Sequence, residues 1–326
     1  MLTLAVVISV LITTVHLMKH HLWSEIKAVS LSSSLSNATC NYVCFAIPIT
    51  GNGLGNHLFY FAGVQYVAWL TGRTPCIQNG SSSSPLDQVF DLDIARVNVE
   101  GRCPVRRFRH MLVYAYNPEV MTLVNVPANW SILNMASFCS WRYTHPITER
   151  LRRALKFRAK PAKLAANFMS SSVPPGWTAS SFVRVGVHVR RGDFLTKWAI
   201  EAGFTTATPL YLRRAMGYFV ERFARIQFIV ASNDIPWCRK HTRTSTWDRN
   251  AVNITFSQGQ SAGTDLAILA SCDHTVMTTG TFGWWAAWLA NGTTVYYPAF
   301  PRPGSSLGNR SRVEDYYPPS WIPIDG

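Results

Sequence analysis

The sequence is poor in charged residues and poorest in acids. Charged residues make up 15% of the 326 positions, and 17 Asp and Glu stand against 31 Lys and Arg. No internal repeat is visible, so a repeat architecture is excluded. Hydrophobic residues account for 48% of the chain, which is ample for one sizeable folded unit, built as one or two lobes.

Clusters of metal ligands are also lacking. Cys40 and Cys44 have no second cysteine pair or histidine cluster at ligand distance, which excludes a zinc finger. Asp91-Leu92-Asp93 has the form of a DxD metal motif, but it lies between Phe90 and Ile94, and we interpret it as structural. We therefore predict that the protein needs no metal and no cofactor.

The first eighteen residues contain no charge. This segment, 1–18, is at the short end of the length that spans a bilayer. No small-residue cleavage site is obvious, so we predict an uncleaved signal-anchor, with a cleaved signal peptide and a buried helix as the alternatives. The serine-rich residues that follow predict a stem over 19–45.

N-glycosylation sequons are spread over the rest of the chain. They begin at Asn37, Asn79, Asn129, Asn253, Asn291 and Asn309. Their number and spread predict a luminal body in an oxidising compartment, where some of the seven cysteines pair. An odd count leaves at least one cysteine unpaired, and the sequence does not fix the pairing. A luminal chain meets no nucleic acid, so the net charge of +14 points to an anionic small substrate or lipid headgroups.

The most informative segment is a strand that runs into a polar turn. Valines alternate with polar or small residues over 183–189, so one face of the strand is apolar, and His188 and Arg190 project from the other. Arg191 and Asp193 follow in the turn. Ligands of open α/β sheets bind at the carboxyl ends of strands, and guanidinium groups pair with phosphate oxygens. The alternative is a solvated Arg–Asp ion pair.

A glycine-rich turn near the N-terminus predicts a second ligand contact. We expect a strand at Ala46–Ile49, a turn through Gly51, Gly53 and Gly55, and a helix over 56–70 that stops at Gly72. The glycine spacing is not the dinucleotide fingerprint, because the third glycine arrives one residue early. The backbone amides of Gly53, Gly55 and Asn56 can still cradle an anionic ligand.

Strands and helices alternate in the second half of the chain. We expect strands at 182–189, 226–232, 274–278 and 293–297, and helices around 211–223, 265–271 and 282–289. This alternation predicts a parallel Rossmann-like sheet. A Pro-containing segment, 170–176, is the expected linker between an N-terminal lobe, 46–176, and a C-terminal lobe, 177–326.

Five blocks in this order resemble the α1,2-fucosyltransferase family. His188 to Asp193 is similar to its HxRRGD signature. The others are Asn52–Phe59 with Ala68–Arg73, Phe228–Asp234 with Trp237-Cys238, Cys272–Met277 with Gly280–Ala290, and Pro319–Ile324. The resemblance implies a GT-B-like α/β fold of two Rossmann-like lobes, GDP-fucose as donor bound by the C-terminal lobe, no metal, and a single-pass type II protein of the Golgi membrane.

The resemblance also implies roles for the residues of the signature. Arg190 becomes the diphosphate ligand and His188 a nucleotide contact, whereas Arg191 is either a donor contact or an internal ion-pair partner. Asp193 is either a general base or the structural partner of an arginine. Thr281, at the start of the 282–289 helix, is a second phosphate ligand or a simple N-cap.

Two further acids are candidates for reading guanine. A carboxylate accepts from the N1–H and the exocyclic amine of that base, and we slightly prefer Asp265, whose alternative role is a helix cap, to Asp273. The tryptophans Trp284, Trp285 and Trp288 recur at helical spacing, which favours core packing over a sugar platform.

The predicted activity is transfer of L-fucose from GDP-fucose to the 2-hydroxyl of a terminal β-galactose, by an inverting and metal-independent enzyme. Two alternatives stay open: a fucosyltransferase of another linkage, α1,6 or protein O-linked, and an inactive membrane-tethered lectin. We expect acceptor contacts mainly in the N-terminal lobe, where the motifs are weakest.

Overall fold

The computed structural model describes residues 40–46, 53–78, 84–243, 246–248 and 250–326, within the compact unit Cys40–Gly326. The anchor expected at 1–18, most of the stem, Asn37, Asn79 and Gly51 lie outside these residues. No helix of the described ranges is long and apolar enough to cross a membrane.

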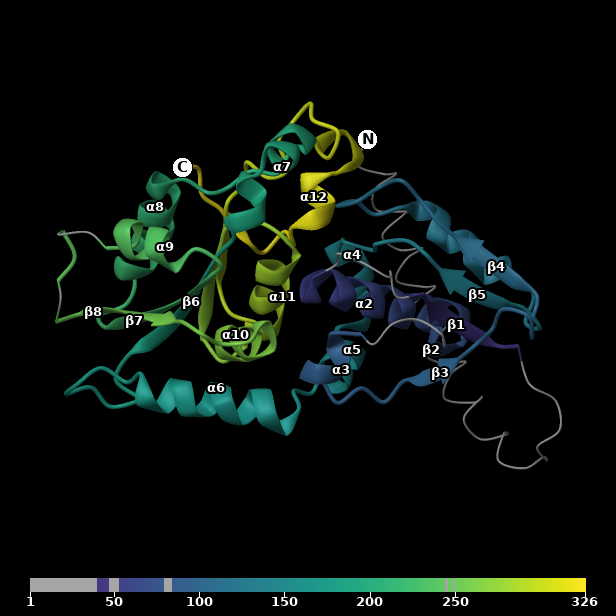
Figure 1. Cartoon of the computed structure of the whole chain (residues 1–326), viewed down its shortest axis with the longest axis horizontal. Helices are drawn as coiled ribbons and strands as arrows, with labels where there is room; N and C mark the ends of the chain where they lie inside the picture. Colours follow the sequence, from purple (N-terminus) through teal and green to yellow (C-terminus); the bar gives the residue numbers. More distant parts are fainter. Residues whose placement is uncertain (1–39, 47–52, 79–83, 244–245, 249) are drawn as a thin grey trace, which may run out of the picture. The chain divides into compact units, whose positions relative to one another are not determined.

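The N-terminal lobe is built on a five-stranded sheet in which every strand pair is parallel (Figure 1). Its order is β3-β2-β1-β5-β4, with bounds Tyr42–Phe45 (β1), Thr74–Gln78 (β2), Ala95–Val97 (β3), Val105–Phe108 (β4) and Ser131–Asn134 (β5). The strand expected at 46–49 lies, apart from Ala46, outside the described residues, and β1 lies inside the segment predicted as stem. Its side chains Val43, Cys44 and Phe45 are fully buried, which explains why it belongs to the folded body.

The C-terminal lobe carries a six-stranded sheet, also parallel at every pair. Its order is β11-β10-β9-β6-β7-β8, with bounds Val183–Val189 (β6), Ile226–Ser232 (β7), Val252–Ser257 (β8), His274–Met277 (β9), Thr294–Tyr296 (β10) and Ile322–Pro323 (β11). The four strands expected here are confirmed to within about a residue at each end. The sequence reading did not include β8, β11 or the helix that follows β7.

Helices connect the strands of both sheets. The α-helices are Leu54–Thr71 (α2), Leu86–Val89 (α3), Trp141–Thr144 (α4), Thr148–Ala154 (α5), Ala159–Ser171 (α6), Lys197–Ala202 (α7), Pro209–Val220 (α8), Ile235–His241 (α9), Ala262–Ala270 (α10), Thr281–Ala290 (α11) and Val313–Tyr316 (α12). The 3₁₀ segments of the described residues are Pro118–Asn125 (η1), His145–Ile147 (η2), Gly192–Leu195 (η3) and Gly308–Arg310 (η4). As predicted, α2 stops at Gly72, which adopts the left-handed conformation with φ 71°.

The chain passes from the N-terminal to the C-terminal lobe before α6, and not at the expected linker 170–176. Ala165 and Met169 of α6 share a buried cluster with Ile229 of β7 and Ile268 of α10, and Figure 1 draws α6 along the C-terminal lobe. The amphipathic face of α6 therefore covers the second sheet, although its sequence precedes the proline pair.

The end of the chain returns to the N-terminal lobe. Val113 N–H donates to Arg310 O at 2.9 Å, and Ser140 Oγ donates to Asp315 O at 2.6 Å. Arg142 pairs with the Asp315 carboxylate at 2.8 Å. These contacts tie α12 to α4 and join the two lobes a second time.

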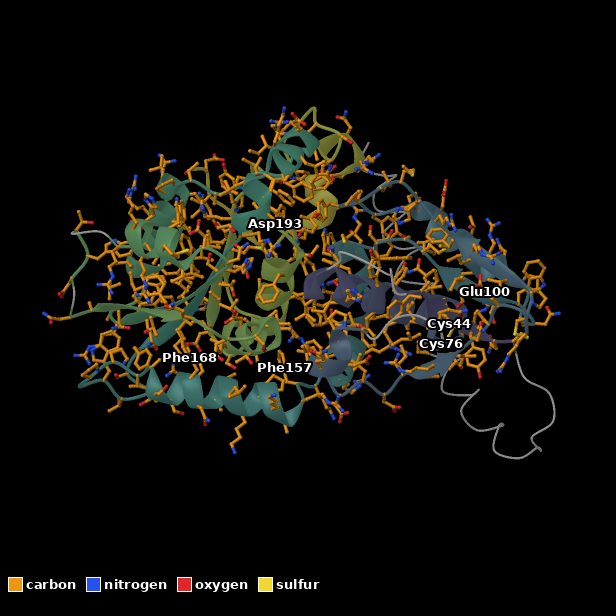
Figure 2. The ribbon with its side chains drawn as sticks, in the orientation of Figure 1. Cys44, Cys76, Glu100, Phe157, Phe168 and Asp193 are labelled. Carbon is orange, nitrogen blue, oxygen red and sulfur yellow. A yellow bond between two sulfur atoms is a disulfide. The ribbon has the colours of Figure 1, made fainter. Side chains whose placement is uncertain are left out.

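Two disulfides staple the first sheet. They join Cys40 to Cys103 and Cys44 to Cys76, and Figure 2 shows the second pair side by side on β1 and β2. Cys139, Cys238 and Cys272 are free and buried. The prediction that at least one of the seven cysteines is unpaired is therefore confirmed, with three rather than one.

The two lobes are packed together by α2 and α11. The ring of Phe59 lies 4.7 Å from that of Trp284 and 5.1 Å from that of Trp285, and both indoles are fully buried. The predicted core role of these tryptophans, and of Trp288, is confirmed. Closer to the helix starts, a Cβ on Gly55 would lie 2.5 Å from Phe282 N and from Thr281 C, so only glycine lets the two backbones meet.

We predict that Gly55→Ala destabilises the protein by about 1–3 kcal/mol, because the added methyl group collides with the rigid backbone of α11. Gly217→Ala is the matched control, since this second helical glycine has nothing within 4 Å of its would-be Cβ. Alanine there raises stability by about 0.5–1 kcal/mol through helix propensity. Thermal melts of the two variants should shift in opposite directions, and equal shifts would contradict the close approach.

Candidate functional site

The polar turn after β6 lies at the centre of the second sheet, at its carboxyl edge. Arg190 N–H donates to Thr278 Oγ1 at 2.9 Å, and Thr278 N–H donates to His188 O at 3.1 Å. These bonds hold the end of β6 beside the end of β9, and α11 begins three residues after Thr278. The turn in which we expect the site therefore lies at the carboxyl end of a central strand.

Arg190 is ion-paired but accessible. Its Nη2 lies 2.8 Å from Asp193 Oδ2, and its guanidinium lies 5.4 Å from the ring centre of Phe194. The Arg190 side chain is 37% exposed, and Figure 2 places Asp193 beside the end of β6. The carboxylate and the ring fix one side of the guanidinium, which leaves its other donors to a ligand. Of the two roles considered for Asp193, this geometry gives that of arginine partner.

Arg191 is held in the protein interior. Its Nε lies 3.1 Å from Asp234 Oδ2, its guanidinium stacks 3.9 Å from the ring centre of Trp237, and its side chain is only 14% exposed. Its backbone N–H donates to Asn233 Oδ1 at 2.9 Å. Of the two roles considered for Arg191, the structure has the internal ion pair, which fixes the turn after β6.

His188 is buried against the start of α11. His188 is only 5% exposed, and its ring centre lies 5.1 Å from that of Phe282. Its Nδ1 atom has no hydrogen-bond partner among the described residues. A Cβ on Gly283 would lie 2.5 Å from Nδ1, so glycine makes room for the ring. Burial, reinforced by the charge of Arg190, lowers the pKa of His188 to about 3. The imidazole is neutral at physiological pH, and its predicted nucleotide contact stays a prediction.

Two helix N-termini meet beside these residues. Thr281 Oγ1 donates to Asn56 Oδ1 at 2.8 Å across the contact between α11 and α2. The N-cap residues are Gly280 and Gly53, and neither provides a side-chain cap. Thr281 is thus the first residue of its helix, and its interpretation as a simple N-cap is wrong. Two positive dipole ends, neither with a side-chain cap, thus converge where Gly53, Gly55, Asn56 and Thr281 were expected to bind the donor.

The two acids considered for guanine recognition lie in different places. Asp273 accepts the Arg184 N–H at 2.8 Å, at the amino end of β6, so the alternative that it reads guanine is wrong. Asp265 lies in the first turn of α10, where Ser257 Oγ donates to it at 2.5 Å and burial raises its pKa. The cap of that helix is Ser261, which accepts the Thr264 N–H, so Asp265 is not a cap.

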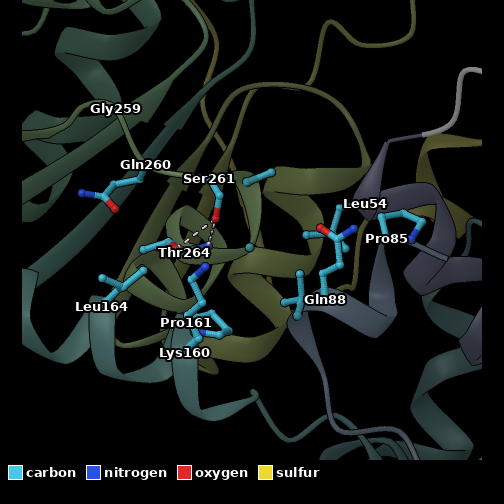
Figure 3. Close-up of a pocket in the computed structure, with 13 residues that line it drawn as sticks. Leu54, Pro85, Gln88, Lys160, Pro161, Leu164, Gly259, Gln260, Ser261 and Thr264 are labelled. Atoms are coloured by element: carbon cyan, nitrogen blue, oxygen red, sulfur yellow. Dashed lines mark hydrogen bonds between the residues drawn. The ribbon is translucent and has the colours of Figure 1, made fainter. Parts of the chain in front are cut away.

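A cavity of about 610 Å³ adjoins the start of α2 (Figure 3). Leu54 of α2 and Gln88 of α3 line one wall, Lys160 and Leu164 of α6 a second, and the 259–264 segment before and within α10 a third. The sequence did not reveal these lining residues, because they come from four separated segments. The only local signal was Gly259 followed by the Ser261 cap.

Metal-ligand clusters are not found in the described ranges: no group of three or more His, Cys, Asp or Glu side chains could hold an ion there. Asp91 contributes its backbone N–H to Lys156 O at 2.8 Å, in keeping with a structural Asp91-Leu92-Asp93 segment.

The described sequons differ in accessibility. Asn129 and Asn309 are exposed, as is Asn291, whereas Asn253 is half-buried. Asn253 Oδ1 accepts from Thr255 Oγ1 at 3.0 Å within β8, and Asn291 Oδ1 accepts from Arg152 at 2.7 Å. The first two are therefore free for a glycan without loss of an internal bond.

Comparison with known proteins places this geometry in a family. The chain is 30% identical to mouse (Mus musculus) galactoside alpha-(1,2)-fucosyltransferase 1 over 98% of its own length and 84% of that protein. It is 33% identical to the pig (Sus scrofa) protein of the same name, covering 83% of this chain and 72% of that one.

Solved structures share the fold. A mutant of Arabidopsis thaliana FUT1 in complex with GDP superposes with a TM-score of 0.55 at 14% identity, covering 83% of this chain and 72% of that one. POFUT1 in complex with GDP gives 0.51 at 13% identity, with 80% and 99% covered. The two-lobed α/β fold is therefore like that of these fucosyltransferases, as predicted. The sequence profile of glycosyl transferase family 11 matches residues 91–325, and the chain belongs to that family.

Proposed function

We propose that this protein transfers L-fucose from GDP-fucose to the 2-hydroxyl of a terminal β-galactose. The mouse and pig relatives carry names that specify this α1,2 transfer to galactosides. The observation that carries the proposal is the convergence of Arg190 with the uncapped starts of α2 and α11. Such a site suits a diphosphate, the part of the donor that gains negative charge as the sugar departs.

The diphosphate binds against Arg190 and Thr281. Fucosyl transfer breaks a sugar–phosphate bond through an oxocarbenium-like transition state, as glycoside hydrolysis breaks a sugar–oxygen bond. The planar guanidinium donates to two phosphate oxygens at once, and Asp193 holds it in that orientation. Because the positive charge comes from an arginine and two helix dipoles, the reaction needs no metal ion.

The nucleoside extends into the cavity beside α10. Leu54 lines this cavity and is adjacent to Gly55 at the start of α2, so a donor with its phosphates at the helix starts reaches it. Asp265 follows directly on the last lining residue, Thr264. Its carboxylate, held by Ser257, is the group assigned to the N1–H and amine of guanine.

The acceptor hydroxyl attacks fucose from the side opposite the diphosphate, which inverts the anomeric centre. Asp193 is engaged with Arg190, so its primary role is orientation. The departing phosphate or a water molecule can accept the acceptor proton, and a base role for Asp193 is the alternative that the Asp193→Asn variant would reveal.

We place the protein in the Golgi membrane as a single-pass type II chain with a luminal body. The uncharged 1–18 segment supports an anchor. The exposed sequons Asn129 and Asn309 and the two disulfides support an oxidising, glycosylating compartment.

Incubation of the full-length protein with GDP-fucose and a β-galactoside should yield a fucosylated product linked at the galactose 2-hydroxyl. Linkage analysis by NMR measures this directly, and the rate should be unchanged by EDTA. A different linkage would support a transferase of another specificity, and galactoside binding without turnover would support a lectin. Loss of turnover with EDTA, restored by Mn²⁺, would contradict the metal-independent mechanism.

Arg190→Lys should lower kcat by about 10- to 100-fold, because lysine keeps the charge but loses the planar guanidinium that donates to two phosphate oxygens. This range corresponds to a charge-assisted hydrogen bond of about 1.5–3 kcal/mol that is strongest as the diphosphate departs. The matched control is Arg107→Lys, which alters another half-exposed arginine–carboxylate pair, Arg107–Glu100, on β4. The two variants should melt like the wild type, and wild-type turnover by Arg190→Lys would show that the diphosphate binds elsewhere.

A further inference from the structure

A tryptophan stands almost free in solvent beside the site. Trp198 of α7 is 71% exposed, whereas the tryptophans of α11 are buried. Leu195 and Ile200 nearby are also exposed. Large apolar side chains in a group on the surface mark places where a ligand binds.

The exposure of Trp198 does not come from a loose segment. The helix α7 is capped by Thr196, whose hydroxyl accepts the Ala199 N–H at 3.3 Å, and Ala199 is buried. At its other end, Leu307 N–H donates to Ala202 O and Arg302 N–H donates to Gly203 O, each at 2.9 Å. The indole is therefore presented on a fixed support.

A row of rings connects this support to the reacting end of the site. The guanidinium of Arg190 lies over Phe194, whose ring centre is 4.6 Å from that of Phe204, and Phe204 lies 5.9 Å from Trp198. Phe194 and Asp193 belong to η3, which leads directly into α7. Figure 1 shows α7 next to the segment that follows β6. The exposed indole thus borders the site on the side of the Arg190–Asp193 pair.

The charges around Trp198 indicate what kind of ligand covers it. Lys197 and Glu201 flank it on the same helix, form a loose pair at 3.9 Å and stay largely exposed. A rim with charges of both signs suits neither an acyl chain nor a strongly charged partner. It suits a neutral ligand with many hydroxyls and one apolar face. β-Galactosides have this character, because the C–H groups on one side of the ring stack on the negative face of an aromatic ring.

We propose that Trp198 is an acceptor-binding residue, a platform on which the β-galactoside glycan stacks while the galactose 2-hydroxyl faces the donor. This inference rests on the proposed function, since it assumes a galactoside acceptor. It also assigns part of the acceptor site to the C-terminal lobe, in contrast to the expectation that the N-terminal lobe provides most of these contacts.

The test is steady-state kinetics of the full-length protein with N-acetyllactosamine as acceptor and GDP-fucose as donor. Trp198→Ala should raise the acceptor KM about fivefold to tenfold, the loss expected for one aromatic stacking contact. The KM for GDP-fucose and kcat should stay within about twofold of the wild type. Trp198→Tyr should restore most of the acceptor affinity, because a ring is retained.

The matched control is Trp130→Ala, which removes a partly exposed tryptophan that precedes β5 in the other lobe and should leave both KM values unchanged. An unchanged acceptor KM in Trp198→Ala overturns the platform, as does an equal rise in the GDP-fucose KM. If Trp198→Ala impairs only binding to a membrane or to another protein, the surface serves a different partner, and the proposed acceptor platform is also overturned. If the wild type itself makes no fucosylated product, the proposed function fails instead, so the two failures are distinguishable.

Discussion

The contact between the starts of α2 and α11 is the constraint on which the site depends. Gly55 lies against the Thr281–Phe282 peptide, and Asn56 accepts a hydrogen bond from Thr281. One helix belongs to each lobe, so this contact brings together two helix N-termini that lack a side-chain cap. Phe59, Trp284 and Trp285 pack directly behind it. The aromatic core and the anion-binding end of the site are thus two parts of one helix pair.

The polar residues around that point divide into those that face a ligand and those that support them. Arg190 remains accessible. Arg191 is used internally, stacked on Trp237 and paired with Asp234. His188 is kept neutral by burial, which lowers its pKa. It therefore contributes packing against Phe282 but no charge. One arginine and two helix dipoles thus supply the positive potential, without a metal-ligand cluster among the described residues.

The sequence predicted the C-terminal lobe better than the N-terminal one, for physical reasons. Strands such as β6 and β7 are buried on both faces and alternate with helices, so their apolar runs are clear. In the N-terminal lobe, β4 reads Val-Arg-Arg-Phe at a sheet edge, a pattern with little strand signal. Its disulfide pairing depends on which strands become neighbours, which local pattern does not reveal.

Candidate site residues could be named where one segment carries them, whereas residues that several segments bring together were missed. Arg190, Asp193 and Thr281 stand in recognisable motifs. The cavity wall joins Gln88, Lys160 and the 259–264 segment, which only the fold brings together. Asp273 and Asp265 lie eight positions apart, and the sequence alone made them nearly equal candidates for guanine recognition. In the structure, Asp273 lies at the amino end of β6, away from the strand end that carries Arg190.

A crystal structure of the protein with GDP tests this account most directly. It should show the β-phosphate within about 3 Å of the Arg190 guanidinium and of Thr281 Oγ1 or the first N–H groups of α11, with guanine in the cavity beside α10. A diphosphate bound away from the meeting point of α2 and α11, with Arg190 still paired only to Asp193, would contradict it.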